Sequence, residues 1–158
     1  GRVAEETLTH QGFRVVTLPV RSPVQVLSAV AVHDSHRVLA DDVAAMAAAA
    51  AATRCGEIHL KDGRFVATNC VVAATHTTIS YEPGEPLVGD DPCALALRAL
   101  DALLSPGSEL VTVVAAPELA ADISRAVRAA HPAVEVTQVT LAGAAGADFA
   151  TSVWWGVE

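Results

Sequence analysis

The sequence predicts an α/β fold made of two small lobes, and three observations support this prediction. A strand–helix–strand pattern runs from Glu109 to Val139, where a short apolar run rich in β-branched residues precedes a helix with regularly spaced apolar residues. The dipeptide Asp62-Gly63 follows an alternating stretch and is typical of a two-residue hairpin turn. An alanine-rich run, Val43 to Ala52, indicates a packing helix, because alanine costs least to place in a helix.

The first lobe is expected over residues 1–89 and to be incomplete, because the chain begins inside a helix-like stretch without an initiating Met. A polar helix is expected over 2–11, and the run FRVVTL at 13–18 predicts a strand. The next helix is predicted over 22–32, with Ser22 as its N-cap and a proline at its first position. This helix is apolar almost all round, so we expect it to be buried.

Further along this lobe, the segment His33–Arg37 breaks the helical pattern and is interpreted as a loop. Asp41 and Asp42 open the alanine-rich helix, which is expected to end near Thr53. The strands that follow are expected to be short, at 57–61, 64–66, 71–72 and 79–81.

The second lobe is expected over residues 90–158, with its elements in the order αβαβ. Its first helix opens at Gly89–Pro92 and carries an apolar line of leucines. Pro117 suits the first position of the central helix. The remaining elements are predicted as strand 110–114, helix 117–130, strand 134–141 and a final strand at 151–158 that carries both tryptophans.

Composition excludes several classes of function. The 158 residues carry a formal net charge of −8, which argues against a nucleic-acid partner, because phosphate backbones require a cationic face. Three widely spaced cysteines with no CxxC argue against a disulfide framework, and a reducing cytoplasm is the expected location. No signal peptide opens the chain, and no apolar run reaches membrane-spanning length, so no transmembrane segment is predicted.

The candidate reactive residues favour structural roles. His33 and His36 form an HxxH, but a zinc or iron site needs at least three converging ligands, and no cysteine lies nearby. A mixed site of His59 and His76 with the neighbouring cysteines is possible in principle, but the cysteines are interpreted as small core residues. The acidic pairs Asp41-Asp42 and Asp90-Asp91 stand at helix starts, where carboxylates cap N–H groups.

Nucleotide and hydrolase motifs are absent from the sequence. It contains no GxGxxG, no GxxxxGK[ST] and no GxSxG, and its GxxG at Gly143 and Gly146 falls far short of a phosphate loop. We therefore predict no catalytic residue, no metal site and no cofactor in this chain.

Four ordered stretches resemble one family. They are residues 13–34 (FRVVTLPVRSPVQVLSAVAVHD), 41–60 (DDVAAMAAAAAATRCGEIHL), 89–104 (GDDPCALALRALDALL), and 109–139 together with the terminal SVWWGVE. The sequence resembles the C-terminal region of bacterial dihydroxyacetone-kinase-like proteins that act as fatty acid kinases. Where that family shows GGQPlYP, this chain lacks the Gln and the Pro but keeps Gly143.

The resemblance implies a role in lipid metabolism. In such proteins an N-terminal domain binds ATP and magnesium, and a separate DegV-type fatty-acid-binding protein presents the acyl chain for phosphorylation. The C-terminal region is expected to be non-catalytic and to dock that carrier, so that the absent kinase domain can form the acyl phosphate. Arg21, Ser22 and Gln25 match the family's positions, and with Gly143 they are the expected partner-binding residues.

Two other functions remain open. The first is a stand-alone enzyme or small-ligand-binding α/β domain, with its site at the carboxyl ends of the strands. The second is self-association as a homodimer, through the apolar helix at 22–32 or through Trp154 and Trp155. A defined pocket with converging polar groups would favour the first of these.

Overall fold

One sheet organises the whole molecule. The computed structural model describes residues 2–75, 78–141 and 151–158, and it describes side chains in these ranges outside 2–5, 71–75 and 78–83. Its described strands form a seven-stranded sheet in the order β3-β2-β1-β7-β5-β6, with β4 paired to β2. The strands are β1 (Arg54–Lys61), β2 (Arg64–Thr75), β3 (Thr78–Pro83), β4 (Leu87–Gly89), β5 (Leu110–Ala115), β6 (Glu135–Thr140) and β7 (Val153–Val157).

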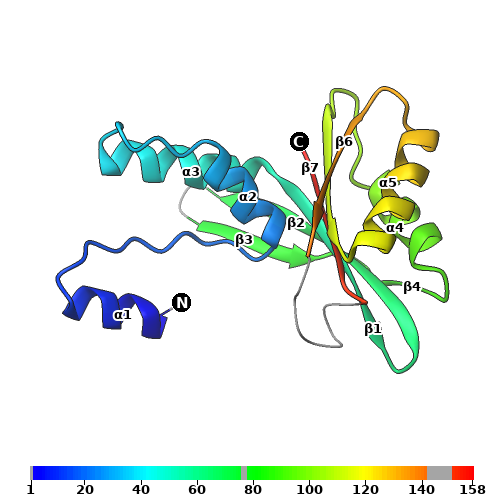
Figure 1. Cartoon of the computed structure of the whole chain (residues 1–158), viewed down its shortest axis with the longest axis horizontal. Helices are drawn as coiled ribbons and strands as arrows, with labels where there is room; N and C mark the ends of the chain where they lie inside the picture. The colour runs from blue at the N-terminus through cyan, green and yellow to red at the C-terminus, as the bar shows by residue number, and fades with distance from the viewer. Residues whose placement is uncertain (1, 76–77, 142–150) are drawn as a thin grey trace.

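The helices cover the two faces of this sheet unequally (Figure 1). Helices α4 (Pro92–Asp101) and α5 (Pro117–Ala130) pack side by side on one face. On the other face α2 (Pro23–Ala31) contacts β5 and β7, and α3 (Leu39–Ala52) packs against α2. Helix α1 (Arg2–His10) lies apart from the sheet, at the end of an extended segment. Within the described residues, no helix has both the length and the apolar character needed to cross a bilayer.

The main core lies between the sheet and helices α4 and α5. Alternate residues of each strand point to this face, because successive side chains of a strand face opposite sides. Trp155 is the largest fully buried side chain, and it packs in one cluster with residues from every neighbouring element. The fully buried members include Ile58, Leu100, Val111, Val113, Ile123, Val127 and Val153. Helices α4 and α5 cover this face of the sheet and bury these side chains.

The local predictions for the hairpin and the strand–helix–strand unit are confirmed, as is the α/β class. Asp62 and Gly63 have positive φ angles of 52° and 77°, which the tight turn between β1 and β2 requires. Strand β5 and strand β6 pair in parallel, with Leu110 opposite Glu135, and α5 provides the crossover between them. Pro117 occupies the first turn of α5 as expected.

The sheet joins the two predicted lobes. Strand β7, from the end of the chain, pairs antiparallel with both β1 and β5. Gly56 of β1 therefore lies opposite Trp155. The boundary expected near residue 89 falls inside one continuous sheet, and the segments on its two sides share the core described above.

The strand predicted at 13–18 is wrong. These residues belong to an extended segment, 13–21, which forms no strand in the described structure and which we call the N-terminal arm. Phe13 is 60% exposed and Val16 is 51% exposed. High β-propensity describes side chains that fit a half-buried pleated surface, and it produces a strand only where a neighbouring strand completes the hydrogen bonds.

The predicted burial of the helix at 22–32 is only partly confirmed. Val24, Gln25 and Ala29 of α2 are buried against the sheet and α3. The opposite side of the helix exposes Val26, Leu27 and Val30, as well as Val32 just beyond it. An apolar helix is expected to be buried all round only when other elements surround it, and α2 is covered on one side.

Candidate functional site

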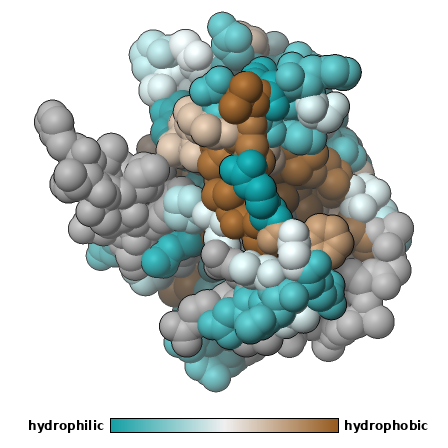
Figure 2. Space-filling view, turned by 90° about the vertical axis from the view of Figure 1, so that its left-hand side faces the viewer, coloured by the Kyte–Doolittle hydropathy of each residue, from teal (hydrophilic) through white to brown (hydrophobic). Residues whose placement is uncertain are grey.

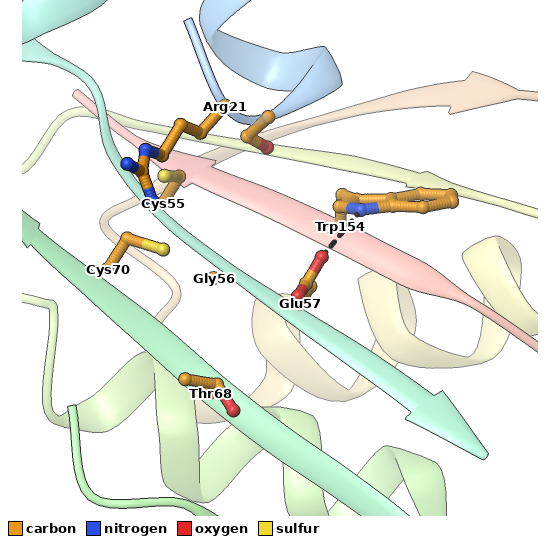
Figure 3. A pocket seen from close by; sticks show the side chains of 8 residues that line it. Arg21, Cys55, Gly56, Glu57, Thr68, Cys70 and Trp154 are labelled. Atoms are coloured by element: carbon orange, nitrogen blue, oxygen red, sulfur yellow. Dashed lines mark hydrogen bonds between the residues drawn. The ribbon is translucent and has the colours of Figure 1, made fainter. Parts of the chain in front are cut away.

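The α2 side of the sheet is hollowed. A cavity of about 420 Å³ lies beside the first turn of α2 (Figure 3). We call it the polar cavity, and its lining residues are Arg21, Ser22, Cys55, Gly56, Glu57, Thr68, Cys70 and Trp154. These residues come from the N-terminal arm, the start of α2 and the three central strands β1, β2 and β7.

Strand alternation places the reactive side chains in this cavity. Cys55 and Glu57 are two residues apart on β1, so both face α2, whereas Ile58 belongs to the opposite core. Cys55 lies directly opposite Cys70 of β2 in the antiparallel register. Figure 3 shows the two side chains leaving neighbouring strands toward the same space, with Arg21 close by. Both cysteines are free thiols.

The Cys55 thiol is a weak acid. Burial raises its pKa to about 12, and the neighbouring Cys70 thiol adds to this rise. The hydroxyl of Ser22 opposes the shift because it would donate to a thiolate. At neutral pH Cys55 is therefore protonated, and it contributes no charge to the cavity.

Trp154 and Glu57 form the opposite end of the polar cavity. The indole Nε1 of Trp154 donates to Glu57 Oε2 at 3.1 Å. In Figure 3 this pair lies away from Arg21, so the cavity has a cationic end and an anionic end.

Two of the predicted partner-binding residues, Arg21 and Ser22, line this cavity, whereas the third, Gln25, lies inside the fold. Gln25 is fully buried, accepts a hydrogen bond from the Arg21 backbone N–H at 3.0 Å, and donates to the Ala50 carbonyl at 3.2 Å. The first contact joins α2 to the residue before its N-cap, and the second holds α2 against α3. The fourth residue, Gly143, lies outside the described residues. Whether these positions bind a partner stays a prediction.

Ser22 occupies the predicted N-cap position of α2, but its hydroxyl does not cap the helix. The residue is 7% exposed, and its side chain makes no cap hydrogen bond. Its Oγ has no hydrogen-bond partner among the residues that the structure describes. Most buried hydroxyls are paired, so this one requires an explanation.

An apolar groove begins at the same two residues. A hollow of about 530 Å³ lies between the first turns of α2 and the β5–β6 edge of the sheet, and Arg21 and Ser22 contribute to its wall. A second hollow of about 540 Å³ continues past Leu27 and Val139 toward the end of α2. We call the two together the apolar groove. Its apolar lining residues are Val20, Pro23, Val26, Leu27, Ala31, Val32, Ala49, Ala52, Leu110, Val114, Val139 and Leu141, and the second hollow is also lined by Ser28, Thr112, Thr137 and Glu158.

His33 and His36 each contact one aspartate, Asp42 and Asp34 respectively. His33 Nδ1 lies 2.6 Å from Asp42 Oδ2, and Arg37 and the Asp34 N–H contact the other carboxylate oxygen at 3.3 and 2.9 Å. The Asp34 N–H holds the pKa of the Asp42 carboxyl below its usual value, against the opposing effect of burial. Within the described residues, no three His, Cys, Asp or Glu side chains converge as a metal site would require.

The acidic pairs behave in different ways. Asp91 caps α4 as predicted, because its carboxylate accepts from the N–H groups of Cys93 and Ala94 at 2.8 and 3.3 Å. Asp90 instead pairs with Arg64 at 3.1 Å. Asp42 lies in the first turn of α3, but it ties down the preceding loop rather than capping the helix.

Sequence reasoning missed the polar cavity as a site. The interpretation of the cysteines as small core residues is confirmed for Cys55, which is fully buried with Val24 and Val114. It was not predicted that Cys55 and Glu57, which begins the strand expected at 57–61, also line a cavity. The available signal was the two-residue spacing of Cys55 and Glu57, which puts both on one face. What the spacing could not provide is the pairing with Cys70 and Trp154, which depends on the register of two other strands.

The fold is similar to that of a solved DegV family protein from Eubacterium eligens, whose structure was determined loaded with heptadecanoic acid. The two share 15% sequence identity with a TM-score of 0.53, so the likeness concerns the fold alone. It covers 85% of this chain and 55% of that protein, so the chain matches about half of its length. No curated protein matches the chain. The family model for the C-terminal region of FakA-like proteins, those similar to the A component of fatty acid kinase, matches residues 2–143, and the chain belongs to this family.

Proposed function

We propose that this chain is a non-catalytic, cytoplasmic region of a fatty-acid-kinase-like protein, and that it docks a DegV-type fatty-acid-binding protein. In this proposal a separate kinase domain, with ATP and magnesium, forms the acyl phosphate while the carrier is held here. Membership of the family and the absence of nucleotide motifs from the sequence support the proposal. The fold likeness to a DegV family protein fits a lipid-related role.

The observation that carries the docking proposal is the distribution of exposed apolar side chains. Nine of the eleven large hydrophobic residues that the described part of the chain exposes lie between Leu8 and Leu39. They belong to α1, the N-terminal arm and the α2–α3 hairpin. Figure 2 faces this side of the molecule and shows hydrophobic side chains gathered in its middle, surrounded by polar ones. Apolar surface concentrated in this way is typical of a protein–protein interface.

A hollow of about 280 Å³ lies within this surface, between the N-terminal arm and the hairpin. Val16 and Leu18 of the arm form one wall, and Val30 forms part of the other. The remaining lining residues are His33, Leu39, Asp42, Val43 and Met46. An apolar side chain of a partner fits such a hollow, and binding energy concentrates where an anchor residue fills a pocket.

Calorimetric titration with the DegV-type protein of the same organism, loaded and empty and without ATP, tests the proposal. Val30 is 58% exposed, so Val30→Glu leaves the fold intact while it places a charge beside the hollow. We expect saturable binding that this variant weakens at least tenfold. Val88→Glu, on the exposed side of β4 away from the arm, is the matched control and should bind like the unmodified chain.

Three results would contradict the docking proposal. One is the absence of binding to either form of the carrier. Another is equal weakening by Val30→Glu and Val88→Glu, which would show that the surface is not specific. The third is transfer of phosphate from ATP by the isolated chain, which would make it an enzyme in its own right. Heats of dilution without the carrier report self-association, and a dimer closed by Val30 would assign the surface to a second copy of the chain.

A further inference from the structure

Ser22 lies between two cavities, and its hydroxyl makes no hydrogen bond to any residue that the structure describes. It lines both the polar cavity and the apolar groove, and it is 7% exposed. Burying a hydroxyl without a hydrogen-bond partner lowers the stability of the folded protein. A ligand that hydrogen-bonds this oxygen would remove that cost.

The electrostatic surroundings of Ser22 favour an anionic ligand. The N-terminus of α2, a helix of nine residues, carries partial positive charge and begins immediately after Ser22. The guanidinium group of Arg21 lines the same cavity. The Cys55 thiol beside it is neutral at physiological pH. Glu57, the negative group of this cavity, is hydrogen-bonded to Trp154 at the other end of the view in Figure 3.

The apolar groove determines what the rest of the ligand must be. It starts at Arg21 and Ser22 and follows α2, whose nine residues span about 13 Å. Next to Ser22 its walls are apolar, with Val26 and Leu27 of α2 facing Val114 and Val139 of the sheet. Farther along, apolar side chains still predominate, but Ser28, Thr112, Thr137 and Glu158 also line it. A mainly apolar path that begins at a cationic, hydrogen-bonding head is complementary to an unbranched amphiphile rather than to a compact polar metabolite.

We propose that the chain itself binds an unbranched aliphatic carboxylate, with its carboxylate at Ser22 and Arg21 and its alkyl chain in the apolar groove. Val26, Leu27 and Val32 belong both to the exposed apolar surface and to the apolar groove, whereas Val30, which tests docking, lines neither the polar cavity nor the groove. The proposal does not require a carrier protein, and it goes beyond the docking function.

Titration of the isolated chain with dodecanoate below its micellar concentration tests this site, with no carrier present. Trp154 lines the polar cavity, so its fluorescence supplies a second readout besides calorimetry. We expect one saturable site. Dodecanol should bind at least tenfold more weakly, because it lacks the charge, and shortening the acid should weaken binding about two- to fourfold per methylene.

Two variants test the head-group contacts. Ser22→Ala should weaken dodecanoate at least fivefold, and Arg21→Gln should weaken it at least tenfold. Arg125→Gln is the matched control, since Arg125 lies on α5 at the opposite face of the sheet and pairs with Asp122. Because the Ser22 hydroxyl has no partner within the described residues, Ser22→Ala should unfold at the same temperature as the unmodified chain or higher.

The proposal is overturned if no saturable binding occurs, or if dodecanol binds as well as dodecanoate. It is also overturned if Ser22→Ala and Arg21→Gln bind as the control does, because the groove would then take up alkyl chains without a head-group site. Loss of carrier binding in Val30→Glu with unchanged dodecanoate binding would separate the two proposals. Failure of either one leaves the other standing on its own data.

Discussion

Gln25 is one of the partner-binding residues that the family resemblance predicts, and its replacement tests whether its role is structural or whether it contacts a partner. The structure gives the side chain two hydrogen bonds inside the fold, one from the Arg21 N–H and one to the Ala50 carbonyl. Gln25 is fully buried, and both its amide oxygen and its amide nitrogen are hydrogen-bonded inside the fold. Its side chain is therefore not placed to contact a partner. We expect Gln25→Ala to act on the stability of the α2–α3 hairpin first, and on docking only through it.

The expected loss of stability follows from these contacts. Each hydrogen bond contributes about 1 kcal/mol, and the buried Ala50 carbonyl would lose its side-chain donor. The removed side chain also leaves a cavity, whose cost adds to the lost burial of about 0.8 kcal/mol per methylene. Together these contributions lower the free energy of unfolding by about 2–4 kcal/mol, which corresponds to a decrease in Tm of about 4–16 °C.

Urea unfolding, followed by tryptophan fluorescence and by circular dichroism, measures this change. Gln138→Ala is the matched control, because Gln138 is exposed on the edge strand β6, and its replacement should cost less than about 0.5 kcal/mol. The reasoning is refuted if Gln25→Ala is as stable as the control but no longer binds the DegV-type carrier. That outcome would make Gln25 a direct contact residue, in a conformation different from the one described.

Three further predictions concern the sheet, the hairpin loop and the thiols. Gly56→Ala should lower stability by about 1–3 kcal/mol in urea unfolding, because its Cβ would lie 2.5 Å from Trp155 Nε1, whereas Gly89→Ala, with 3.4 Å to its nearest neighbour, should be close to neutral. Asp42 has a lowered pKa, so the stability that its carboxylate contributes is complete above the ordinary value of 3.8 and is lost as the pH falls through the lower folded value. The urea midpoint of Asp42→Asn should therefore fall less than that of the unmodified chain between about pH 6 and 3; equal slopes would contradict this reasoning. Cys55, with a pKa of about 12, should be alkylated at pH 8 about a thousandfold more slowly than a free thiol, and mass spectrometry should find rapid labelling of this residue only in denaturant.

The parts of the fold that were predictable are those whose cause is local. The apolar spacing of α5 and the β-branched run of β5 lie within about 20 residues of each other, and Asp62-Gly63 specifies its turn without help from the rest of the chain. The position of β7 between β1 and β5 has no such local cause. It depends on pairs such as Gly56 with Trp155, which lie far apart in the sequence. No periodicity in either strand encodes that pairing.

The N-terminal arm and α2 show how the same limit affects function. Both segments are apolar, and propensity placed the first in a sheet and the second in a core. Burial depends on what other elements cover a segment, and here the covering is incomplete, so Phe13 and Val30 stay exposed. The residues that local rules assign most readily to the interior are therefore those that support the docking proposal.

The site beside α2 was predictable in one respect, the position of Ser22 at the start of a helix. Its environment was not, because the polar cavity draws on β1, β2 and β7 together. An N-cap serine is normally explained by its hydrogen bond to the first turn, and replacing it by alanine then costs about 1 kcal/mol. Here that bond is absent.

Ser22→Ala therefore decides between two explanations of the same residue. If the hydroxyl is a cap in solution, the variant loses about 1 kcal/mol of stability and keeps its affinity for dodecanoate. If the hydroxyl serves a ligand, the variant is as stable as the unmodified chain or more stable, and its affinity falls. Stability falls only under the first explanation and affinity falls only under the second, so a single variant assigns the hydroxyl either to the fold or to a site.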